Sequence, residues 1–304
     1  MSDQVRIVEV GPRDGLQNEK TPVSVDARIA FIEALVGAGL HTVEVGAFVS
    51  PKAIPQMIGS DEVLRRVSHH PDGEFHVLVP NEKGYEAARA AGAKVIAVFG
   101  SASEGFSRAN INCSVAESIE RFKPVIARAL ADGVRVRGYI SCVLGCPFDG
   151  KIKPQAVVDV ARILRDLGCY EISLGDTIGV GTPKKARELI RAVAGHVPIA
   201  HLAMHFHDTY GQALANLYAG MEEGARAIDS AAGGLGGCPY APGATGNVAT
   251  EDVVYMLAGL GISTGVDMEK LVQATNEISM LIGRPPVSRV AAALNAGKRR
   301  ANSE

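Results

Sequence analysis

Several features that would indicate a membrane, nucleic-acid-binding or secreted protein are missing from this sequence of 304 residues. No uninterrupted apolar stretch approaches the roughly 18 residues that a transmembrane helix needs. The formal net charge is −2, which gives the chain no attraction for nucleic acid or for an anionic membrane. The first residues enter a strand pattern at once, without a signal or transit peptide. We therefore expect a cytoplasmic protein with no nucleic-acid and no membrane partner.

Cysteine is also scarce, and the five cysteines make an odd number. Without a secretion signal this number suits a reducing compartment and free thiols. Cys142 and Cys146 are too few for a structural zinc site, which usually has four ligands.

What the sequence does contain is a regular alternation of short β-branched runs and longer helical patterns. Strand-like runs are found at Arg6–Val10, Thr42–Phe48, Phe75–Val79, Val95–Phe99, Val134–Cys142, Glu171–Leu174, Leu202–His207 and Ala227–Ser230. Helix-like segments lie near residues 25–38, 60–68, 82–92, 115–132, 154–167, 183–195, 211–223 and 250–259.

Eight strand–helix units in this length are typical of an α/β protein of the (β/α)8 or TIM-barrel class. A doubly wound open sheet is the alternative, but no GxGxxG motif follows the first strand. A further helical segment, 267–282, follows the eighth unit. We predict one catalytic domain, 1–304, with the barrel at about 5–262 and a C-terminal helical extension at about 266–295.

The motif HFHDTYGQ at 205–212 is the most informative stretch for function. In a strand, residues i and i+2 point to the same side, so His205 and His207 would aim two imidazoles in one direction at a strand end. Imidazole suits several transition metals, and two histidines alone do not choose the metal. Paired histidines that only hydrogen-bond to their neighbours are the alternative interpretation.

The active site of a barrel lies at the carboxyl ends of its strands, where further polar residues are expected here. These residues are Arg13 and Asp14 after the first strand, Glu44 in the second, Asn110 beyond the fourth, Tyr139 in the fifth, Asp176 at the end of the sixth, and Asn247 in the glycine-rich segment after the eighth. Carboxylates and an amide would thus converge with the two histidines on one rim.

Several long strings in the chain resemble the 3-hydroxy-3-methylglutaryl-CoA lyase family. They are VEVGPRDGLQNEK (8–20), FVSPK with PQM (48–57), SASEGFSRANINC (101–113), GYISCVLGCP (138–147), CYEISLGDTIGVGTP (169–183), HFHDTYGQALAN (205–216) and GGLGGCPYAPGATGN (233–247). The likeness spans about residues 5 to 268. It implies a metal-dependent barrel enzyme that cleaves its acyl-CoA substrate to acetyl-CoA and acetoacetate, in the superfamily that includes isopropylmalate and homocitrate synthases.

The resemblance implies a metal site formed by Asp14, His205, His207 and Asn247. Two hard oxygens and two imidazoles, completed by water and substrate oxygens, can hold Mg²⁺ or Mn²⁺. A turn-forming role for Asp14 and a helix-capping role for Asn247 are the alternatives.

The resemblance also implies catalytic residues. Arg13 would stabilise the enolate oxygen as charge develops there, and Cys238, on the glycine-rich loop, would be the catalytic cysteine. The group that first takes the hydroxyl proton stays open between Cys238, His205 and a metal-bound water. A surface or structural ion pair is the alternative for Arg13, and a buried small hydrophobe is the alternative for the cysteine.

The remaining expectations concern supporting residues. Glu44 is expected to support Arg13 or a bound water, and Asp176 to orient a ligand or the substrate, with ion pairing and helix capping as their alternatives. Lys20 and Asn110 are expected to contact CoA. The segment 233–247 suits a lid over the substrate.

The chain departs from the family pattern at Val45-Gly46-Ala47, where familiar members have hydroxyl-bearing residues. This departure leaves open a related 3-hydroxyacyl-CoA with a different 3-substituent. A citramalate- or isopropylmalate-type condensing synthase and a non-catalytic metal-binding protein are the other hypotheses. We further expect a homo-oligomer, with a dimer as the simplest case, and a role in leucine degradation.

Overall fold

A computed structural model describes residues 4–237 and 246–301, and it shows a closed barrel of parallel strands. The strands are β1 (Arg6–Glu9), β2 (Thr42–Ala47), β3 (Glu74–Leu78), β4 (Val95–Ser101), β5 (Arg135–Ser141), β6 (Glu171–Asp176), β7 (Leu202–Phe206) and β8 (Ala227–Ser230). Each strand pairs with the next, and β8 closes on β1. The predicted fold class is therefore confirmed.

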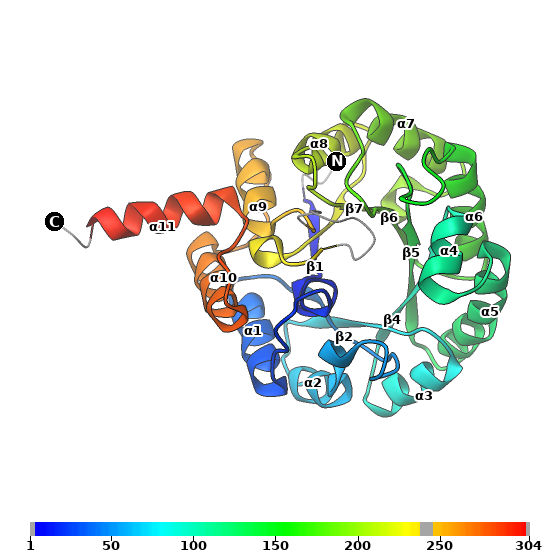
Figure 1. Cartoon of the computed structure of the whole chain (residues 1–304), viewed down its shortest axis with the longest axis horizontal. Coiled ribbons are helices and arrows are strands. Elements are labelled where there is room, and N and C mark those ends of the chain that lie inside the picture. Colours follow the sequence, from blue (N-terminus) through cyan, green and yellow to red (C-terminus); the bar gives the residue numbers. More distant parts are fainter. Residues whose placement is uncertain (1–3, 238–245, 302–304) are drawn as a thin grey trace.

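Helices surround this barrel (Figure 1). Those that connect consecutive strands or follow β8 are α1 (Val25–Gly37), α2 (Ser60–Val67), α3 (Glu82–Ala90), α5 (Val115–Ala131), α6 (Pro154–Asp166), α7 (Pro183–Ala194), α8 (Ala213–Glu222) and α9 (Thr250–Gly259). Their starts follow capping chemistry: Ser114 and Glu117 form a capping box at α5, and the Ser24 hydroxyl accepts a bond from the first turn of α1.

Three further helices extend the plain barrel pattern. The sequence reading did not separate α4 (Glu104–Ile111), a short helix that comes between β4 and α5. After the barrel come α10 (Met268–Ile282), which packs on α1, and α11 (Arg289–Ala301), which contacts α9 and projects away from the barrel in Figure 1. The predicted C-terminal extension thus contains two helices, and the second reaches beyond residue 295.

Apolar side chains fill the space between strands and helices, but the barrel interior contains charges. Arg137, Glu171 and Asp229 come from β5, β6 and β8 and are almost completely buried, and Arg137 forms an ion pair with each of the two carboxylates. Bulky aliphatic residues usually occupy such interior layers. This protein therefore builds part of its core from ion pairs, directly beneath the carboxyl ends of the strands.

Two of the expectations from composition can be compared with the structure. The four cysteines within the described ranges, Cys113, Cys142, Cys146 and Cys169, are buried and form no disulfide with one another. None of the described helices combines the length and the apolarity that crossing a bilayer requires.

Candidate active site

A pocket of about 430 Å³ opens at the carboxyl ends of the strands. Its polar side comes from the region of β1, β5 and β7 and includes Arg13, Asp14, Tyr139, His205 and His207. Its apolar side comes from the region of β2, β3 and β4 and includes Val49, Ile54, Leu78, Phe99 and Phe106. β1 and β5 flank the β2–β4 group, and β7 lies across the barrel from β3, so the two histidines lie on the far side of the barrel from the apolar wall.

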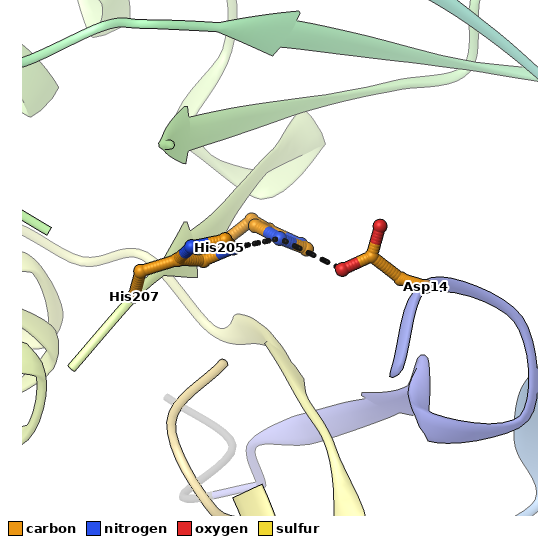
Figure 2. A group of neighbouring side chains, drawn as sticks. All are labelled: Asp14, His205 and His207. Carbon is orange, nitrogen blue, oxygen red and sulfur yellow. Dashed lines mark hydrogen bonds and ion pairs between the residues drawn. The ribbon is translucent and has the colours of Figure 1, made fainter. Parts of the chain in front are cut away.

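The two histidines of the HFH motif lie on the same side of the chain at the end of β7, as the strand period predicts. Their Nε2 atoms are 3.3 Å apart. Asp14 faces them, and one oxygen of its carboxylate lies 3.9 Å from the His205 Nε2 (Figure 2). One ligand atom from each of the three residues falls within 4.8 Å of the others, an arrangement that could hold a metal ion.

Asp14 reaches this position through a single turn of π-helix, Gly11–Gly15, directly after β1. The backbone N–H of Gly15 donates to the carbonyl of Val10, five residues earlier, at 3.2 Å. Such turns are rare and often occur at functional sites. Here the turn presents Arg13 and Asp14, consecutive residues, to the same pocket.

Asn247, in the segment that follows β8, contacts Asp14 of this group. Its Nδ2 donates to the Asp14 carboxylate at 2.9 Å and to the Leu235 carbonyl at 3.1 Å. Its Oδ1 is buried and has no hydrogen-bond partner within the described chain. A buried amide oxygen without a hydrogen-bond donor is unusual, and a cation bound at this position would satisfy it.

The electrostatics of the group favour a cation. Burial alone would raise the pKa of Asp14, but the charges of Arg13 and of the two histidines outweigh burial and lower it to about 2. Burial, followed by the neighbouring His205, lowers the pKa of His207 to about 4. At neutral pH the site therefore offers a carboxylate and at least one unprotonated imidazole.

Arg13 is held firmly beside Asp14 and the two histidines. Its Nε donates to Glu44 at 2.7 Å and its Nη1 donates to Asp14 at 2.8 Å. Burial alone would lower the pKa of Arg13, but the neighbouring charges of Glu44 and Asp14 outweigh it and raise this pKa. The guanidinium is thus a permanent cation at the pocket floor, and its orientation is fixed by two carboxylates.

The other predicted residues differ in their placement. Asp176 accepts bonds from the backbone N–H groups of Val180 and Gly181 at 3.2 and 2.8 Å, so it holds the loop that leads to α7. Burial raises its pKa to about 6. Asn110 on α4 lines the pocket, whereas the described pocket lining does not include the exposed Lys20. Cys238 and the middle of the predicted lid lie outside the described residues.

Sequence reasoning missed the layer beneath the site. The Asp229 carboxylate lies 3.2 Å from the His205 Nδ1 and forms an ion pair with Arg137, whose Nη2 donates to it at 2.6 Å. Burial opposes its ionisation, but Arg137 holds the pKa of Asp229 well below its usual range. The only available signal was the presence of charged residues inside strand patterns, at Val136-Arg137-Gly138 and Ile228-Asp229-Ser230.

Comparison with known proteins agrees with this architecture. Residues 4–278 match the family described as HMGL-like.

The chain belongs to this family.

Among curated HMGL-like relatives, a hydroxymethylglutaryl-CoA lyase from Pseudomonas mevalonii is 56% identical and aligns with 96% of this chain and 97% of its own length. A 3-hydroxy-3-isohexenylglutaryl-CoA/hydroxymethylglutaryl-CoA lyase from Pseudomonas aeruginosa is 58% identical, over 96% of this chain and 98% of the relative. The crystal structure of hydroxymethylglutaryl-CoA lyase from Pseudomonas aeruginosa superposes with a TM-score of 0.95 at 57% identity, and it covers 98% of this chain and 99% of that one.

Within the HMGL-like fold, the departure at Val45-Gly46-Ala47 has a structural context. A Cβ on Gly46 would lie 2.6 Å from the Ser60 hydroxyl oxygen, so this position packs against α2. The Ser60 hydroxyl in turn donates to the Met57 carbonyl and accepts from the backbone of Ala47. Glycine at 46 is thus the residue that this contact permits, and a side chain there would meet α2.

Proposed function

We propose that this protein is a divalent-metal-dependent hydroxymethylglutaryl-CoA lyase, which cleaves 3-hydroxy-3-methylglutaryl-CoA to acetyl-CoA and acetoacetate. Membership of the HMGL-like family supports this activity, as do the names of relatives that align over nearly the whole chain. The observation that carries the proposal is the convergence of Asp14, His205 and His207 with Arg13 in one pocket.

The donor set fits a divalent ion. We assign the metal to Asp14, His205, His207 and Asn247, because the buried Oδ1 of Asn247 lacks a hydrogen-bond partner among the described residues and the two imidazole nitrogens face each other. A carboxylate and an amide oxygen leave Mg²⁺ and Mn²⁺ as the expected ions. When bound, the ion would supply Lewis acidity toward the substrate's hydroxyl and carboxylate oxygens.

The fixed charges of the pocket also suit the substrate. Arg13 and Glu44 cancel each other, so a divalent ion added to the single charge of Asp14 leaves the site with one net positive charge. The free carboxylate of 3-hydroxy-3-methylglutaryl-CoA carries one negative charge. A pocket with this net charge attracts such a ligand.

The cleavage breaks the bond between C2 and C3 and leaves an enolate of acetyl-CoA. The buried guanidinium of Arg13 would stabilise the enolate oxygen, because it is a permanent cation whose position is already fixed before charge develops. Glu44 would hold Arg13 in this orientation. Cys238 would deliver a proton to the enolate carbon. Of the three candidates for the group that first removes the hydroxyl proton, Cys238 and a bound water would remain, because a His205 that binds the ion through Nε2 and faces Asp229 through Nδ1 has no nitrogen left to accept it.

The outer parts of the site have subsidiary roles in this proposal. Asp176 would fix the loop that leads to α7 and, through it, the substrate side of the rim. Asn110 on α4 would contact the CoA chain as it leaves the pocket, and Lys20 would contact the CoA phosphates.

A second substrate has support from the pocket wall. The P. aeruginosa relative is named for a substrate with a 3-isohexenyl group as well as for the 3-methyl compound. In this chain Leu78, Phe99, Phe106 and Ile111 form an apolar wall opposite the charged groups. Such a wall would accept a longer hydrocarbon 3-substituent without burying a polar group.

The setting of the enzyme is also part of the proposal. A cytoplasmic location, a role in leucine degradation and a homo-oligomeric state, most simply a dimer, agree with the activity. The projecting α11, with the exposed Leu294, and the exposed Met280 and Leu281 on α10 are surfaces that a second copy could cover.

The test begins with metal-stripped protein and 3-hydroxy-3-methylglutaryl-CoA, with and without Mg²⁺ or Mn²⁺, and measures acetoacetate. We expect release only with the ion, and its loss in His207→Gln. His201→Gln is the matched control, because His201 directly precedes the same strand at the opposite end of the barrel. Release of free CoA from acetyl-CoA and a 2-keto acid, without lyase activity, would favour a condensing synthase and overturn the proposal.

A further inference from the structure

The Asp229 carboxylate is the most heavily bonded group beneath the site. Arg137 donates to it through Nη1 and Nη2 at 3.0 and 2.6 Å. The Ser173 hydroxyl donates at 2.8 Å, and the His205 Nδ1 lies at 3.2 Å. Both oxygens are therefore occupied, and Asp229 does not belong to the group of side chains whose ligand atoms converge near Asp14.

Arg137 is itself fixed in place. Its Nε donates to Glu171 at 2.7 Å and its Nη1 donates to the Tyr139 hydroxyl at 2.7 Å. Glu171 also pairs with Arg6 at the amino end of the barrel. The guanidinium cannot rotate without breaking hydrogen bonds to residues of β5, β6 and β8. The Asp229 carboxylate that it binds is therefore held in one orientation.

This orientation determines which nitrogen of His205 faces the pocket. An ionised carboxylate only accepts hydrogen bonds, so the contact with Asp229 requires a proton on the His205 Nδ1. A neutral imidazole then has its lone pair on Nε2. That nitrogen is the one that lies 3.3 Å from the His207 Nε2 and 3.9 Å from the Asp14 carboxylate.

We propose that Asp229, locked by Arg137 and Ser173, is the positioning residue that holds His205 with its Nδ1–H toward the barrel interior and its Nε2 lone pair toward a divalent cation. Carboxylates in this relation to a ligating histidine fix its tautomer and ring orientation, and their loss typically weakens metal binding about tenfold to a hundredfold. The inference rests on the proposed metal site and adds the residues that prepare it.

The chain contains a matched control for this inference. At the amino end of the barrel, Glu74 also bridges a histidine and an arginine, with its oxygens 2.8 Å from the His76 Nε2 and 2.9 Å from the Arg135 Nη1. Removal of either carboxylate breaks the same kinds of bond, but only Asp229 touches a proposed metal ligand. Glu74→Gln therefore reports the cost of a lost ion pair without an effect on the cation.

The experiment measures Mn²⁺ affinity by isothermal titration calorimetry on metal-stripped wild-type protein and on Asp229→Asn, Ser173→Ala and Glu74→Gln. We expect about tenfold to a hundredfold weaker binding for Asp229→Asn, a smaller loss for Ser173→Ala, and no change for Glu74→Gln. Asp229→Glu, which keeps the charge but moves the carboxylate, should recover only part of the affinity. Equal affinity in folded Asp229→Asn and wild type would overturn the inference.

A second measurement does not depend on a variant that folds. Nitrogen-15 NMR of metal-free wild-type protein, recorded with the imidazoles neutral, should show His205 as the Nδ1–H tautomer. An Nε2–H tautomer would refute the inference. If the wild-type protein bound no divalent ion at all, the proposed metal site would fail, and the tautomer would still decide whether Asp229 orients His205.

Discussion

Replacement of Arg13 by Met should remove two contributions that a double variant can separate. Met has a similar length but no charge, so Arg13→Met deletes the cation that faces the developing enolate. Loss of a single oxyanion donor usually costs 10²–10³ in kcat, and a charged donor contributes more, so we expect a fall of at least about 10³-fold. The second contribution is to stability: Glu44 has 0% exposure and loses a partner whose nitrogens lie 2.6 and 2.7 Å from its Oε2.

A buried charge left without its partner typically costs about 3–5 kcal/mol of unfolding free energy. In Arg13→Met/Glu44→Gln the stranded charge is gone, so calorimetry should show most of the stability restored. Acetoacetate release at saturating substrate and ion should stay as low as in the single variant. Recovery of activity together with stability would refute the charge-stabilising role and show that the single variant was only poorly folded.

Three further predictions concern parts of the molecule around the site. Burial outweighs the hydrogen bonds from Thr250, Ala232 and Gly11 and raises the pKa of Glu9 to about 7. Because this carboxyl ionises at a lower pH in the unfolded chain than in the folded protein, wild-type stability should fall as the pH rises from about 4.5 to about 7. Glu9→Gln should lose only the part of this fall that Glu9 causes, since burial raises the pKa of Glu251 to about 7 as well. Relative to wild type it should gain up to about 3 kcal/mol at pH 8 but little at pH 4.5, as measured by urea unfolding, and a difference from wild type that is the same at both pH values would contradict this. Gly246 has a φ of +89°, and a Cβ there would lie 2.5 Å from the Gly236 backbone. Gly246→Ala should therefore displace Asn247 and weaken Mn²⁺ binding, as measured by calorimetry. Gly259→Ala, where a Cβ would meet open space, should leave Mn²⁺ binding unchanged. Asn247→Asp replaces a hydrogen-bond donor 2.9 Å from the Asp14 carboxylate by a second carboxylate. Because the two negative charges repel each other, the melting temperature of the metal-free protein should fall and should recover on addition of Mn²⁺. An unchanged melting temperature without metal would argue against the contact.

Much of this molecule could be predicted from local patterns. The β-branched runs and the helical segments between them predicted the closed barrel correctly, because the hydrophobic periods of strands and helices can be recognised in short windows of sequence. The HFH motif placed two imidazoles on one side of β7 for the same reason. Family membership was also predicted correctly from the strings around Asp14, His205 and Asn247.

The features that escaped prediction depend on partners far away in the chain. The bond between Arg137 and Asp229 spans 92 positions, and nothing near either residue shows that the other lies opposite. The π-turn at Gly11–Gly15 reads as an ordinary Gly-Pro turn, because its bond from Gly15 to Val10 becomes visible only in three dimensions. The short helix α4 was missed because its eight residues carry too weak a period for a separate assignment.

The ion pairs within the barrel divide between its two halves. Arg13 and Glu44 both belong to the segment that contains β1 and β2. Arg137, Glu171 and Asp229 all belong to the segment from β5 to β8. The first group therefore balances its charges, whereas the second has two carboxylates for one arginine, and its Glu171 also pairs with Arg6 on β1.

Two arginine–carboxylate pairs that cross between the halves have an arginine that water can reach. Arg6 on β1 meets Glu171 on β6 with 38% of the arginine side chain exposed, and Arg135 on β5 meets Glu74 on β3 with 50% exposed. Separation of the Arg135–Glu74 pair costs little, because water replaces the lost partner, whereas the buried Glu171 would keep only Arg137. A chain cut between β4 and β5 would therefore keep the buried Arg13–Glu44 and Arg137–Asp229 pairs each within one piece, but it would separate the buried Glu171 from Arg6.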